Sequence, residues 1–547
     1  MRGVSELGEI GRLLIIGAAR SGQACAGAAR RVLPQVGVTV SDQDAAALTA
    51  AEQAELAQAG IEVALGRDDA ALLDGCGLVV KSPGVPGEIP LIQEARARGI
   101  PVWGEVEFAS RFLDNVLVGV TGTNGKTTTA ELIGHILRNA GRPSRVAGNV
   151  GTALSTLVGV AGGEDILVVE LSSFQLEDSV EFRPDIAVLL NLSDDHLDRH
   201  SSQAHYYSAK LGIFRNQWMD DLAVLNLDDP AVAVAVIADG ARRVWFSHRQ
   251  MSGGAGESSA EDTKKAIESS ADKGNAIAGE GSAGSGRGGS DGEGSDSEAP
   301  EVAPYVYFQE GFIRADTAGL VRLTLNLRNR LLEKSGVSIE NSGKDGRKAA
   351  GTGEDSQEVV AWAEAGLKGE HNLENSLAAT AVCLALGLSP QEVAAGLTGF
   401  PGVRHRLQEV AVIDGVTYVN DSKATNVDAA LKALTAFDGG VHLILGGSLK
   451  GCSFDPLARA AAAGKVREVL LIGEASGQIA SSMEAAGAGY VMAGRLEEAV
   501  RMARSNAHPG DVVLLAPACA SFDQYENYEE RGEHFISLVS GMTRDEG

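Results

Sequence analysis

The segment 122–128 (Gly-Thr-Asn-Gly-Lys-Thr-Thr) places two glycines, a lysine and several hydroxyl groups close together. It follows a β-branched apolar run at 116–120, which is typical of a buried parallel strand, and it precedes a helical pattern over 131–137. A strand, a glycine-rich loop and a helix point several backbone N–H groups at one phosphate. Lys126 would then reach a β- or γ-phosphate, and the Thr127 hydroxyl would bind Mg²⁺. We therefore expect a nucleoside triphosphate site here.

This loop is shorter than the usual phosphate-binding loop, because Val120 stands where the first glycine would be. A chance glycine turn is therefore the alternative interpretation. The strand before the loop and the helix after it favour the phosphate site.

Polar side chains also follow the other apolar runs of this region. One run, 166–170, ends in a glutamate; the runs 186–191 and 223–226 are followed by segments rich in acidic residues, and 192–200 also holds histidines. Strands that alternate with helices predict a parallel, doubly wound sheet. Ligands of such sheets bind beyond the carboxyl ends of the strands. We expect these polar clusters to lie beside the phosphate loop.

Residues 1–113 have the pattern of a first α/β unit. An apolar strand at 13–17 leads into a small-residue turn and an alanine-rich helix, and a second strand ends at Asp42. This resembles a dinucleotide-binding fingerprint, but Ala19 replaces the middle glycine, which disfavours NAD. We expect a Rossmann-like unit that binds another nucleotide-linked ligand, with Asp42 at a ribose or base. A strand and rigid turn at 78–86 would let the backbone approach that ligand.

The carboxy-terminal part of the chain has the same α/β character. Several of its apolar runs are followed by turns that carry a lysine or a hydroxyl group, at 421–426, 446–450 and 517–523. Such groups after several strands of one sheet predict a site for an anionic substrate. Any one of them could instead have a structural role. The predicted strands are 416–420, 441–446, 469–473 and 512–517.

Two stretches interrupt the α/β pattern of the middle region, at about 250–300 and 334–357. Both consist mainly of glycine, serine, alanine and charged residues, so they cannot bury enough apolar surface to offset the entropy of ordering. We predict two disordered insertions. Short edge strands are expected between them, at 305–308, 312–314 and 320–325.

The composition argues against several classes of partner. The 547 residues carry a formal net charge of −26, whereas nucleic acids and anionic membranes are themselves polyanions. No uncharged apolar run reaches the roughly 18 residues that span a membrane, and the amino terminus lacks the apolar core of a signal peptide. The five scattered cysteines predict reduced thiols in the cytoplasm. We expect no nucleic-acid partner and no membrane insertion.

Another polar group stands at the start of a predicted helix. The spacing of His371, Asn372 and Asn375 places their side chains on one face of that helix. Asn372 could instead cap the helix, and the spacing by itself leaves both interpretations open.

Taken in order, these motifs resemble those of the Mur ligases, which build the peptide stem of bacterial cell-wall precursors. Segments 421–426 and 521–532 are similar to those of the members that add D-glutamate. The resemblance covers nearly the whole chain except the two insertions. The motifs that carry it are the phosphate loop, 170–175, His196, 369–372, Asn375 and 405–406.

The pattern and the resemblance together predict an α/β fold with three domains. The first would be a Rossmann-like N-terminal domain at 1–113, which binds the UDP part of the substrate. The second would be a central P-loop-type ATPase domain with a parallel sheet, at 114–402. The third would be a Rossmann-like C-terminal domain at 403–547, which binds the amino acid and part of the nucleotide.

The resemblance also implies a reaction. ATP would phosphorylate the free carboxylate of UDP-N-acetylmuramoyl-L-alanine, and the amine of D-glutamate would attack the acyl phosphate to give an amide, ADP and phosphate. Because this transfer brings anions together, it needs divalent cations and fixed positive groups. The cofactors implied are ATP and Mg²⁺, with two ions expected. We expect a cytoplasmic monomer.

Matching to the family assigns roles to individual residues. Lys210 matches the lysine that the family carbamylates, which would turn a cation into an anion able to orient a metal, whereas the sequence alone makes it an ordinary surface lysine. The catalytic residues implied are Lys126, Glu170, His196 and Lys210. The metal ligands implied are Thr127, Glu170 and His196. The ATP contacts implied are Gly122, Thr123, Asn124, Gly125, Lys126, Thr127, Thr128, Asn372, Asn375, Arg406, Asp421 and Lys423.

The resemblance further implies three groups of substrate contacts. Those for the uridine diphosphate are Ser21, Asp42, Ser82, Pro83 and Gly84. Those for the muramoyl group are Asn149, Ser172 and Gln175. Those for D-glutamate are Thr425, Lys450, Ser521, Phe522 and Tyr528, with Lys423 nearby. Ser448 departs from the pattern, because related sequences often carry an acid at this position.

Two alternatives remain. The first is another Mur ligase or a folylpolyglutamate synthetase; segments 421–426 and 521–532 favour D-glutamate, and the absence of an Asp-Asn-Pro-Arg tetrapeptide disfavours the diaminopimelate- or lysine-adding member. The second is a nucleotide-binding regulatory module that has lost catalysis. The presence of Lys126, Glu170 and Lys210, together with His196, argues against that module.

Overall fold

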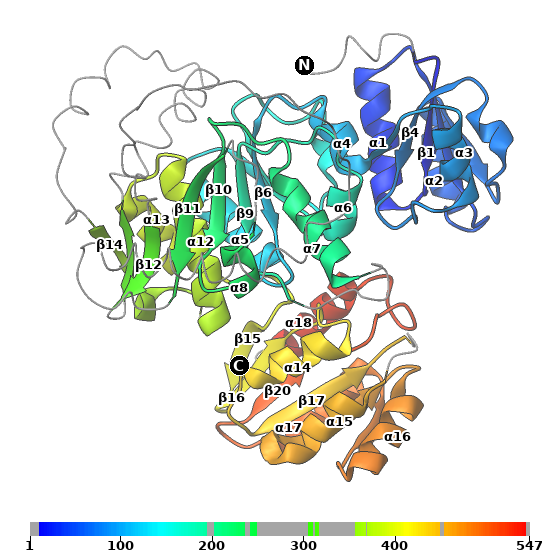
Figure 1. Cartoon of the computed structure of the whole chain (residues 1–547). Coiled ribbons are helices and arrows are strands. Elements are labelled where there is room, and N and C mark those ends of the chain that lie inside the picture. The colour runs from blue at the N-terminus through cyan, green and yellow to red at the C-terminus, as the bar shows by residue number, and fades with distance from the viewer. Residues whose placement is uncertain are drawn as a thin grey trace. The chain divides into compact units, whose positions relative to one another are not determined.

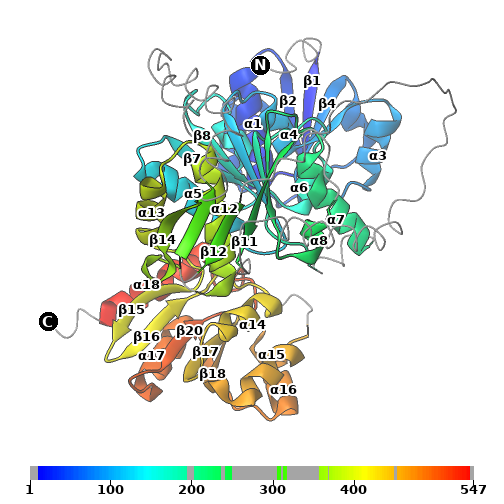
Figure 2. The same cartoon turned by 60° about the vertical axis from the view of Figure 1, so that its left-hand side comes forward.

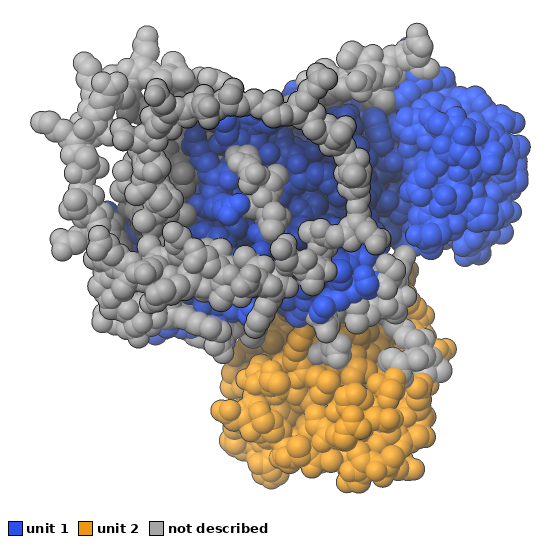
Figure 3. Space-filling view, in the orientation of Figure 1, with its two compact units in different colours: residues 1–400 blue, residues 401–547 orange. Residues whose placement is uncertain are grey.

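The computed structural model describes residues 10–193, 202–235, 241–248, 305–309, 312–316, 356–367, 369–448 and 453–542 (Figure 1). The helices and strands group into two compact units, residues 1–400 and 401–547 (Figure 3). The boundaries of the three predicted domains stay predictions, because the first two of them share one unit. Several predicted features lie outside the described residues: His196, Lys450, the strand at 320–325, the insertion at about 250–300 and most of the insertion at 334–357.

Unit 1 begins with a five-stranded parallel sheet in the order β3-β2-β1-β4-β5. The predicted strand at 13–17 and the strand predicted within 78–86 are confirmed, and their valines, leucines and isoleucines are buried in the strands, as parallel strands covered by helices require. The elements are β1 (Arg12–Ile16), α1 (Arg20–Val32), β2 (Gly37–Asp42), α2 (Ala50–Gln58), β3 (Ile61–Leu65), η1 (Ala70–Leu73), β4 (Cys76–Lys81), α3 (Pro90–Ala97), β5 (Val102–Gly104) and α4 (Glu105–Ser110).

A nine-stranded sheet forms the rest of unit 1, in the order β14-β13-β12-β11-β10-β9-β6-β8-β7. Neighbouring strands from β7 to β12 along this order pair in parallel. β13 pairs antiparallel with both of its neighbours, β12 and β14. The elements as far as β11 are β6 (Val116–Thr121), α5 (Lys126–Asn139), β7 (Ser144–Gly148), η2 (Leu154–Leu157), β8 (Ile166–Glu170), α6 (Ser173–Glu177), β9 (Ile186–Leu189), α7 (Gln203–Leu211), η3 (Gly212–Phe214), β10 (Leu222–Asn226), α8 (Pro230–Ala233) and β11 (Arg242–Ser247).

The three strands at one edge of this sheet, β12 to β14, come after β11 in the chain. The predicted edge strands at 305–308 and 312–314 are confirmed as β12 (Tyr305–Gln309) and β13 (Phe312–Asp316). The predicted disorder is wrong at 356–357, because these residues begin β14 (Ser356–Ala361), which pairs with β13. After η4 (Trp362–Glu364), α12 (Glu370–Ala385) packs on α5 and on β10 to β12, and α13 (Pro390–Thr398) packs on α5 (Figure 2).

Unit 2 is a six-stranded sheet in the order β15-β16-β20-β17-β18-β19, with only β15 antiparallel. Separate apolar clusters cover its two faces. The elements are β15 (Gln408–Ile413), β16 (Val416–Asn420), α14 (Val427–Thr435), β17 (Val441–Gly446), α15 (Asp455–Ala460), η5 (Ala461–Lys465), β18 (Val466–Ile472), α16 (Ser476–Ala486), β19 (Val491–Gly494), α17 (Leu496–Asn506), β20 (Val512–Leu515) and α18 (Tyr528–Met542).

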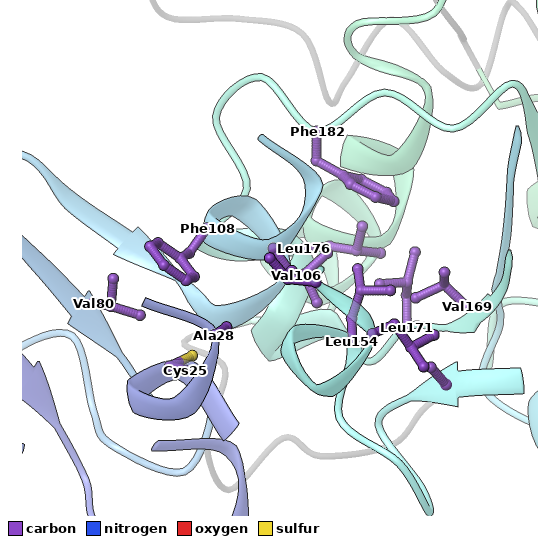
Figure 4. Packing of buried hydrophobic residues seen from close by; sticks show 14 of the residues in the cluster. Cys25, Ala28, Val80, Val106, Phe108, Leu154, Val169, Leu171, Leu176 and Phe182 are labelled. Carbon is purple, nitrogen blue, oxygen red and sulfur yellow. The ribbon is translucent and has the colours of Figure 1, made fainter. Parts of the chain in front are cut away.

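One hydrophobic core runs from the first sheet of unit 1 into the second. Figure 4 shows Cys25 of α1 and Phe108 of α4 in the same cluster as Leu154 of η2 and Val169 of β8. Polar contacts cross the same junction: the Arg31 guanidinium donates to carbonyl oxygens in and after η2, including that of Val158 at 2.8 Å. The two sheets of unit 1 are therefore joined by packing as well as by the chain.

Two further observations concern the thiols and the helices. Cys25, Cys76, Cys383 and Cys519 are free, and burial raises the pKa of the Cys25 and Cys383 thiols. None of the helices in the described ranges combines the length and apolar character that crossing a membrane requires.

Candidate active site

The predicted phosphate loop joins β6, which is buried throughout, to the first turn of α5. Gly122 and Gly125 have φ angles of 150° and 84°, a region that favours glycine. A Cβ atom at Gly125 would collide with Asn375 Oδ1 of α12. The helix begins at Lys126, earlier than the predicted 131, because the polar run after Gly125 hides the helical period in the sequence.

Two lysines converge on one oxygen of this loop. Lys126 Nζ donates to the carbonyl oxygens of Gly122 (3.0 Å) and Thr123 (2.8 Å). Lys210 Nζ of α7 donates to the same Gly122 oxygen at 2.8 Å. Two ammonium groups beside one loop create a positive region suited to an anion.

The sequence alone suggested that Lys210 is a surface residue, but the structure shows that it is buried. Its side chain is 2% exposed, and its ammonium group lies 4.7 Å from the centroid of the Tyr206 ring. The Tyr206 hydroxyl lies 3.2 Å from Thr123 Oγ1. Folding of α7 against the phosphate loop therefore buries this lysine, which the pattern around it in the sequence could not reveal.

Glu170 lies at the carboxyl end of β8, next to the strand that enters the phosphate loop. Its side chain is 3% exposed, and Asn149 Nδ2 donates to its Oε1 at 3.1 Å. A Cβ atom at Gly148 would collide with the Glu170 backbone, so the close approach of β7 to β8 requires glycine there. The structure thus brings together Glu170 and Asn149, which the sequence assigned to the metal and to the substrate.

The residues present fit a magnesium ion. Thr127 and Glu170 offer a hydroxyl and a carboxylate, the hard oxygen ligands that Mg²⁺ prefers, and this ion usually keeps several waters. Within the described part of the chain, no group of three or more His, Cys, Asp or Glu residues is arranged to hold a metal. The predicted ligand His196 lies outside that part.

Ser172 and Gln175 form a capping box at the start of α6. The Gln175 N–H donates to Ser172 Oγ at 3.3 Å, and Gln175 Oε1 accepts from the Ser172 N–H at 3.0 Å. These side chains therefore shape the turn after β8, directly beyond Glu170. A substrate contact for them stays a prediction.

The start of α12 contacts the start of α5. Asn375 Oδ1 accepts from the Thr129 hydroxyl at 3.2 Å, and Asn375 Nδ2 donates to Asn372 Oδ1 at 3.2 Å. The alternative of Asn372 as the helix cap is wrong, because Gly369 occupies the cap position with a φ of 93°. The structure thus places both predicted ATP contacts on a helix that touches the phosphate-loop helix.

The residues predicted for the uridine diphosphate lie at the carboxyl ends of the first sheet. Asp42 accepts the backbone N–H groups of Ala18 (2.8 Å) and Asp44 (3.0 Å). The Ser82 hydroxyl donates to the Gly17 carbonyl at 3.0 Å. These side chains fix the turns after three adjacent strands. Ser21 lies in the first turn of α1, and Pro83 and Gly84 follow Ser82 in the turn after β4.

Unit 2 carries Arg406, Asp421 and Lys423 close together. The Asp421 carboxylate accepts from the Leu407 N–H at 3.3 Å, and the Lys423 N–H donates to the His405 carbonyl at 3.1 Å. Burial raises the pKa of the Asp421 carboxyl to about 6, against the opposing effects of Arg406, the Leu407 N–H and Lys423.

This raised pKa leads to a testable dependence on pH. The folded protein holds the Asp421 proton more tightly than the unfolded chain, so the stabilisation is lost as the pH rises through the window from 3.8 to about 6. We expect the Asp421→Asn variant to lose this contribution. As the pH rises from about 5 to about 7, the wild type should lose about 1 kcal/mol of stability that the variant does not lose. The free energy of unfolding of the variant minus that of wild type should therefore increase by that amount. Urea unfolding measures this, and an equal difference at both pH values would contradict it.

The residues predicted for D-glutamate surround the carboxyl ends of the same sheet. Ser521 is buried, whereas Phe522 is 73% exposed. The Tyr528 ring meets the His405 ring edge-on at 6.4 Å, and the Tyr528 carbonyl accepts from the Ser422 hydroxyl at 2.8 Å. Ser448 contacts Asp523 across the adjoining turns, and Thr425 is half-buried beyond Lys423.

Arg531 of α18 holds these turns together. Its guanidinium is 1% exposed and donates to the Ser422 hydroxyl (3.0 Å) and to four carbonyl oxygens. Burial lowers the pKa of this guanidinium to about 10, against the opposing effects of Cys519, Asp523 and Tyr525. The carbonyl acceptors belong to Ser422, Gly446, Cys519 and Ala520.

Two residues in these arrangements were not among the predicted site residues. Arg531 belongs to the segment 521–532 that carried the family resemblance, but its contacts with three turns have no local signal in the sequence. Asn191 lies two residues after the end of β9, and its Oδ1 accepts from the Asn124 N–H of the phosphate loop at 2.8 Å. The sequence marked it only as the end of a predicted strand. Its position at a strand terminus, facing the phosphate loop, was the signal available.

Comparisons with known proteins identify relatives of this chain. Three family models match the chain: "Mur ligase MurD-like, N-terminal domain" at 11–104, "Mur ligase middle domain" at 120–277 and "Mur ligase, glutamate ligase domain" at 405–519. A protein of Acidobacterium capsulatum named UDP-N-acetylmuramoylalanine--D-glutamate ligase is 37% identical over 96% of this chain and 96% of its own. Its namesake in Pelotomaculum thermopropionicum is 36% identical over 97% and 98%.

Solved structures are similar in fold. UDP-N-acetylmuramate-alanine ligase MurC from Thermotoga maritima is 17% identical, with a TM-score of 0.50 over 97% of this chain and 99% of that one. At this identity, the likeness supports the α/β fold with Rossmann-like and P-loop-type sheets and nothing finer.

Proposed function

The chain belongs to the Mur ligase family of ATP-dependent, amide-bond-forming enzymes of peptidoglycan synthesis, and we propose that it joins D-glutamate to UDP-N-acetylmuramoyl-L-alanine. The reaction would pass through an acyl phosphate. The observation that carries this proposal is the convergence of Lys126 and Lys210 on the Gly122 oxygen of the phosphate loop. The relatives named above supply the choice of D-glutamate.

The phosphate loop would bind the β- and γ-phosphates of ATP. The N-terminus of α5 favours negative charge, and Lys126 adds a full positive charge at that point. The Lys126 ammonium group carries three N–H donors, so it would bind a phosphate oxygen while the two carbonyls continue to hold it. Asn372 and Asn375, which touch this helix from α12, would contact the nucleotide, as would Arg406, Asp421 and Lys423 of unit 2.

Enzymes of this family use ATP and Mg²⁺. Bound Mg²⁺ neutralises charge on the phosphates and on the acceptor carboxylate. Thr127 and Glu170 would hold one ion, and we propose that His196 serves a second. Asn149 would orient the Glu170 carboxylate through its amide.

We also propose that Lys210 is carbamylated in the active enzyme. A carbamate would place an anion where two ammonium groups now face one carbonyl oxygen, which removes their mutual repulsion. The burial of Lys210 against Tyr206 keeps its side chain near the phosphate loop in either form.

Substrate contacts are proposed at the remaining strand ends. The turns held by Asp42 and Ser82 would bind the uridine diphosphate. Segments 421–425 and 521–528, with Lys450, would bind D-glutamate, with a lysine opposite each of its carboxylates. Because both ATP and a nucleotide-linked sugar are substrates, we place the enzyme in the cytoplasm, and we propose that it acts as a monomer.

Phosphate release from ATP and Mg²⁺ tests the function. With UDP-N-acetylmuramoyl-L-alanine present, we expect release when D-glutamate is added and none with L-glutamate, meso-diaminopimelate or L-lysine. Mass spectrometry of the product should show one added glutamate. Release with another amino acid instead would overturn the assignment of substrate, and no release with any of them would overturn the assignment as a ligase.

A further inference from the structure

Pairing between β6 and β9 continues past the ends of both strands. The Leu190 N–H donates to the Thr121 carbonyl at 3.0 Å, and the Thr123 N–H donates to the Asn191 carbonyl at 3.0 Å. Thr123 already belongs to the phosphate loop. The backbone after β9 therefore forms one wall of that loop.

The side chain of Asn191 extends this pairing by one further step. Its Oδ1 accepts from the Asn124 N–H at 2.8 Å, and its Nδ2 donates to the Asn124 carbonyl at 3.3 Å. The primary amide thus bonds both backbone groups of Asn124, as the next residue of a paired strand would. The backbone just before Asn191 is itself held in place, because Asn226 Nδ2, at the end of β10, donates to the Leu190 carbonyl at 2.9 Å.

These two hydrogen bonds fix the direction of two peptide groups. In a trans peptide the C=O of one residue and the N–H of the next point in opposite directions. Because the Asn124 N–H points to Asn191, the Thr123 carbonyl points away from it, and there it accepts from Lys126 Nζ at 2.8 Å. Because the Asn124 carbonyl points to Asn191, the Gly125 N–H is directed away, toward the side of the loop that carries Lys126.

We propose that Asn191 is a positioning residue for the nucleotide phosphates. Its amide orients the Asn124 peptide groups so that the Gly125 N–H faces a bound phosphate and the Thr123 carbonyl holds Lys126 in place. Asn191 does not contact the phosphate in this arrangement. The inference rests on the proposed function of the phosphate loop and adds to it the residue that sets the geometry of the loop.

The test compares Asn191→Ala with a matched asparagine at the other end of β6. Asn115 is a buried asparagine whose Nδ2, like that of Asn191, donates to the backbone; its acceptors are the carbonyls of Gly162 (2.6 Å) and Asp165 (2.9 Å). We expect Asn191→Ala to raise KM for ATP about tenfold and to lower kcat by about as much, since a misdirected N–H loses a hydrogen bond to a charged phosphate. KM for D-glutamate should not change. Asn115→Ala should lower the melting temperature without changing KM for ATP.

A second variant distinguishes the acceptor oxygen of the Asn191 side chain from its donor nitrogen. Asn191→Asp keeps an acceptor for the Asn124 N–H but replaces the donor by an oxygen that repels the Asn124 carbonyl. It should weaken the affinity for ADP, measured by calorimetry, by more than tenfold. Wild-type ADP affinity in this variant, or unchanged KM for ATP in Asn191→Ala, would overturn the inference. Neither result would touch the proposed function, which is tested separately by phosphate release from the wild-type enzyme with each amino acid and by Lys126→Ala.

Discussion

Replacing Lys126 by alanine should lower the rate of ATP-dependent phosphate release by about a thousandfold or more. The ammonium group is held over the phosphate loop by the carbonyls of Gly122 and Thr123, so its charge would be fixed where, in the proposed reaction, negative charge develops during phosphoryl transfer. Removing one preorganised positive group from such a site costs about this much. Steady-state phosphate release with all three substrates measures the effect.

The fold should tolerate this change. Lys126 lies in the first turn of a helix whose apolar face packs elsewhere, and alanine is a good helix former. Lys465→Ala is the matched control, because Lys465 Nζ also donates to a backbone carbonyl, that of Phe437, at an exposed position of unit 2. We expect wild-type turnover in this control. Turnover within tenfold of wild type in Lys126→Ala would remove the phosphate-loop assignment.

Replacing Arg531 by methionine should destabilise unit 2 by several kcal/mol and abolish ligation. The guanidinium is the common donor for five oxygen acceptors, and methionine supplies none. Each buried acceptor left without a donor costs about 1–3 kcal/mol. The turns after β16, β17 and β20, which carry the proposed nucleotide and D-glutamate contacts, would lose the group that fixes their spacing.

Thermal unfolding and steady-state kinetics check this prediction together. Arg531→Lys keeps the charge but offers fewer donors in a different geometry, so it should retain part of the stability and a raised KM for D-glutamate. Arg501→Met is the control at the surface, where Arg501 pairs with Glu498 one turn away. There we expect a change in the free energy of unfolding within about 0.5 kcal/mol. If Arg531→Met matched this control, the structural role of Arg531 would be disproved.

The parts of the site predicted from the sequence are those whose chemistry is local. The phosphate loop is a continuous segment in which glycines, a lysine and hydroxyl groups have one common use. Glu170 could be placed near it because the carboxyl ends of parallel strands lie at one edge of a sheet. In the structure, β8 does lie beside β6. The residue-by-residue roles rested on the family resemblance, and those roles stay predictions.

What the local sequence did not reveal is the burial and the contacts of side chains that meet distant segments. Lys210 is separated from Gly122 by 88 positions, and Arg531 from Ser422 by 109. Nothing in the neighbourhood of either residue in the chain marks it as buried. Asn191 differs, since it stands at a predicted strand end, but the pattern cannot show that its side chain continues the pairing of that strand.

The fold was predictable to the same degree. Apolar runs and turns located most strands, and their alternation with helices fixed the α/β class. The strand order could not be read in this way, because it depends on which faces pack. The start of α5 was placed five residues late, since Thr127, Thr128 and Thr129 interrupt the apolar period although all three are buried in the helix.

The continuous core of unit 1 has a consequence for exchanging segments between relatives. Residues of α1 and α4 pack with η2 and β8 in one cluster. Lys81 of the first sheet pairs at 2.6 Å with Asp178, the residue that follows α6. A chimera that replaces only the first 104 residues would take one side of this packed cluster from the relative and keep the other side from this protein. The foreign half would have to match it in shape, so the first sheet is not an interchangeable module. A segment exchanged between relatives within unit 1 should therefore include η2 and α6 together with the first sheet.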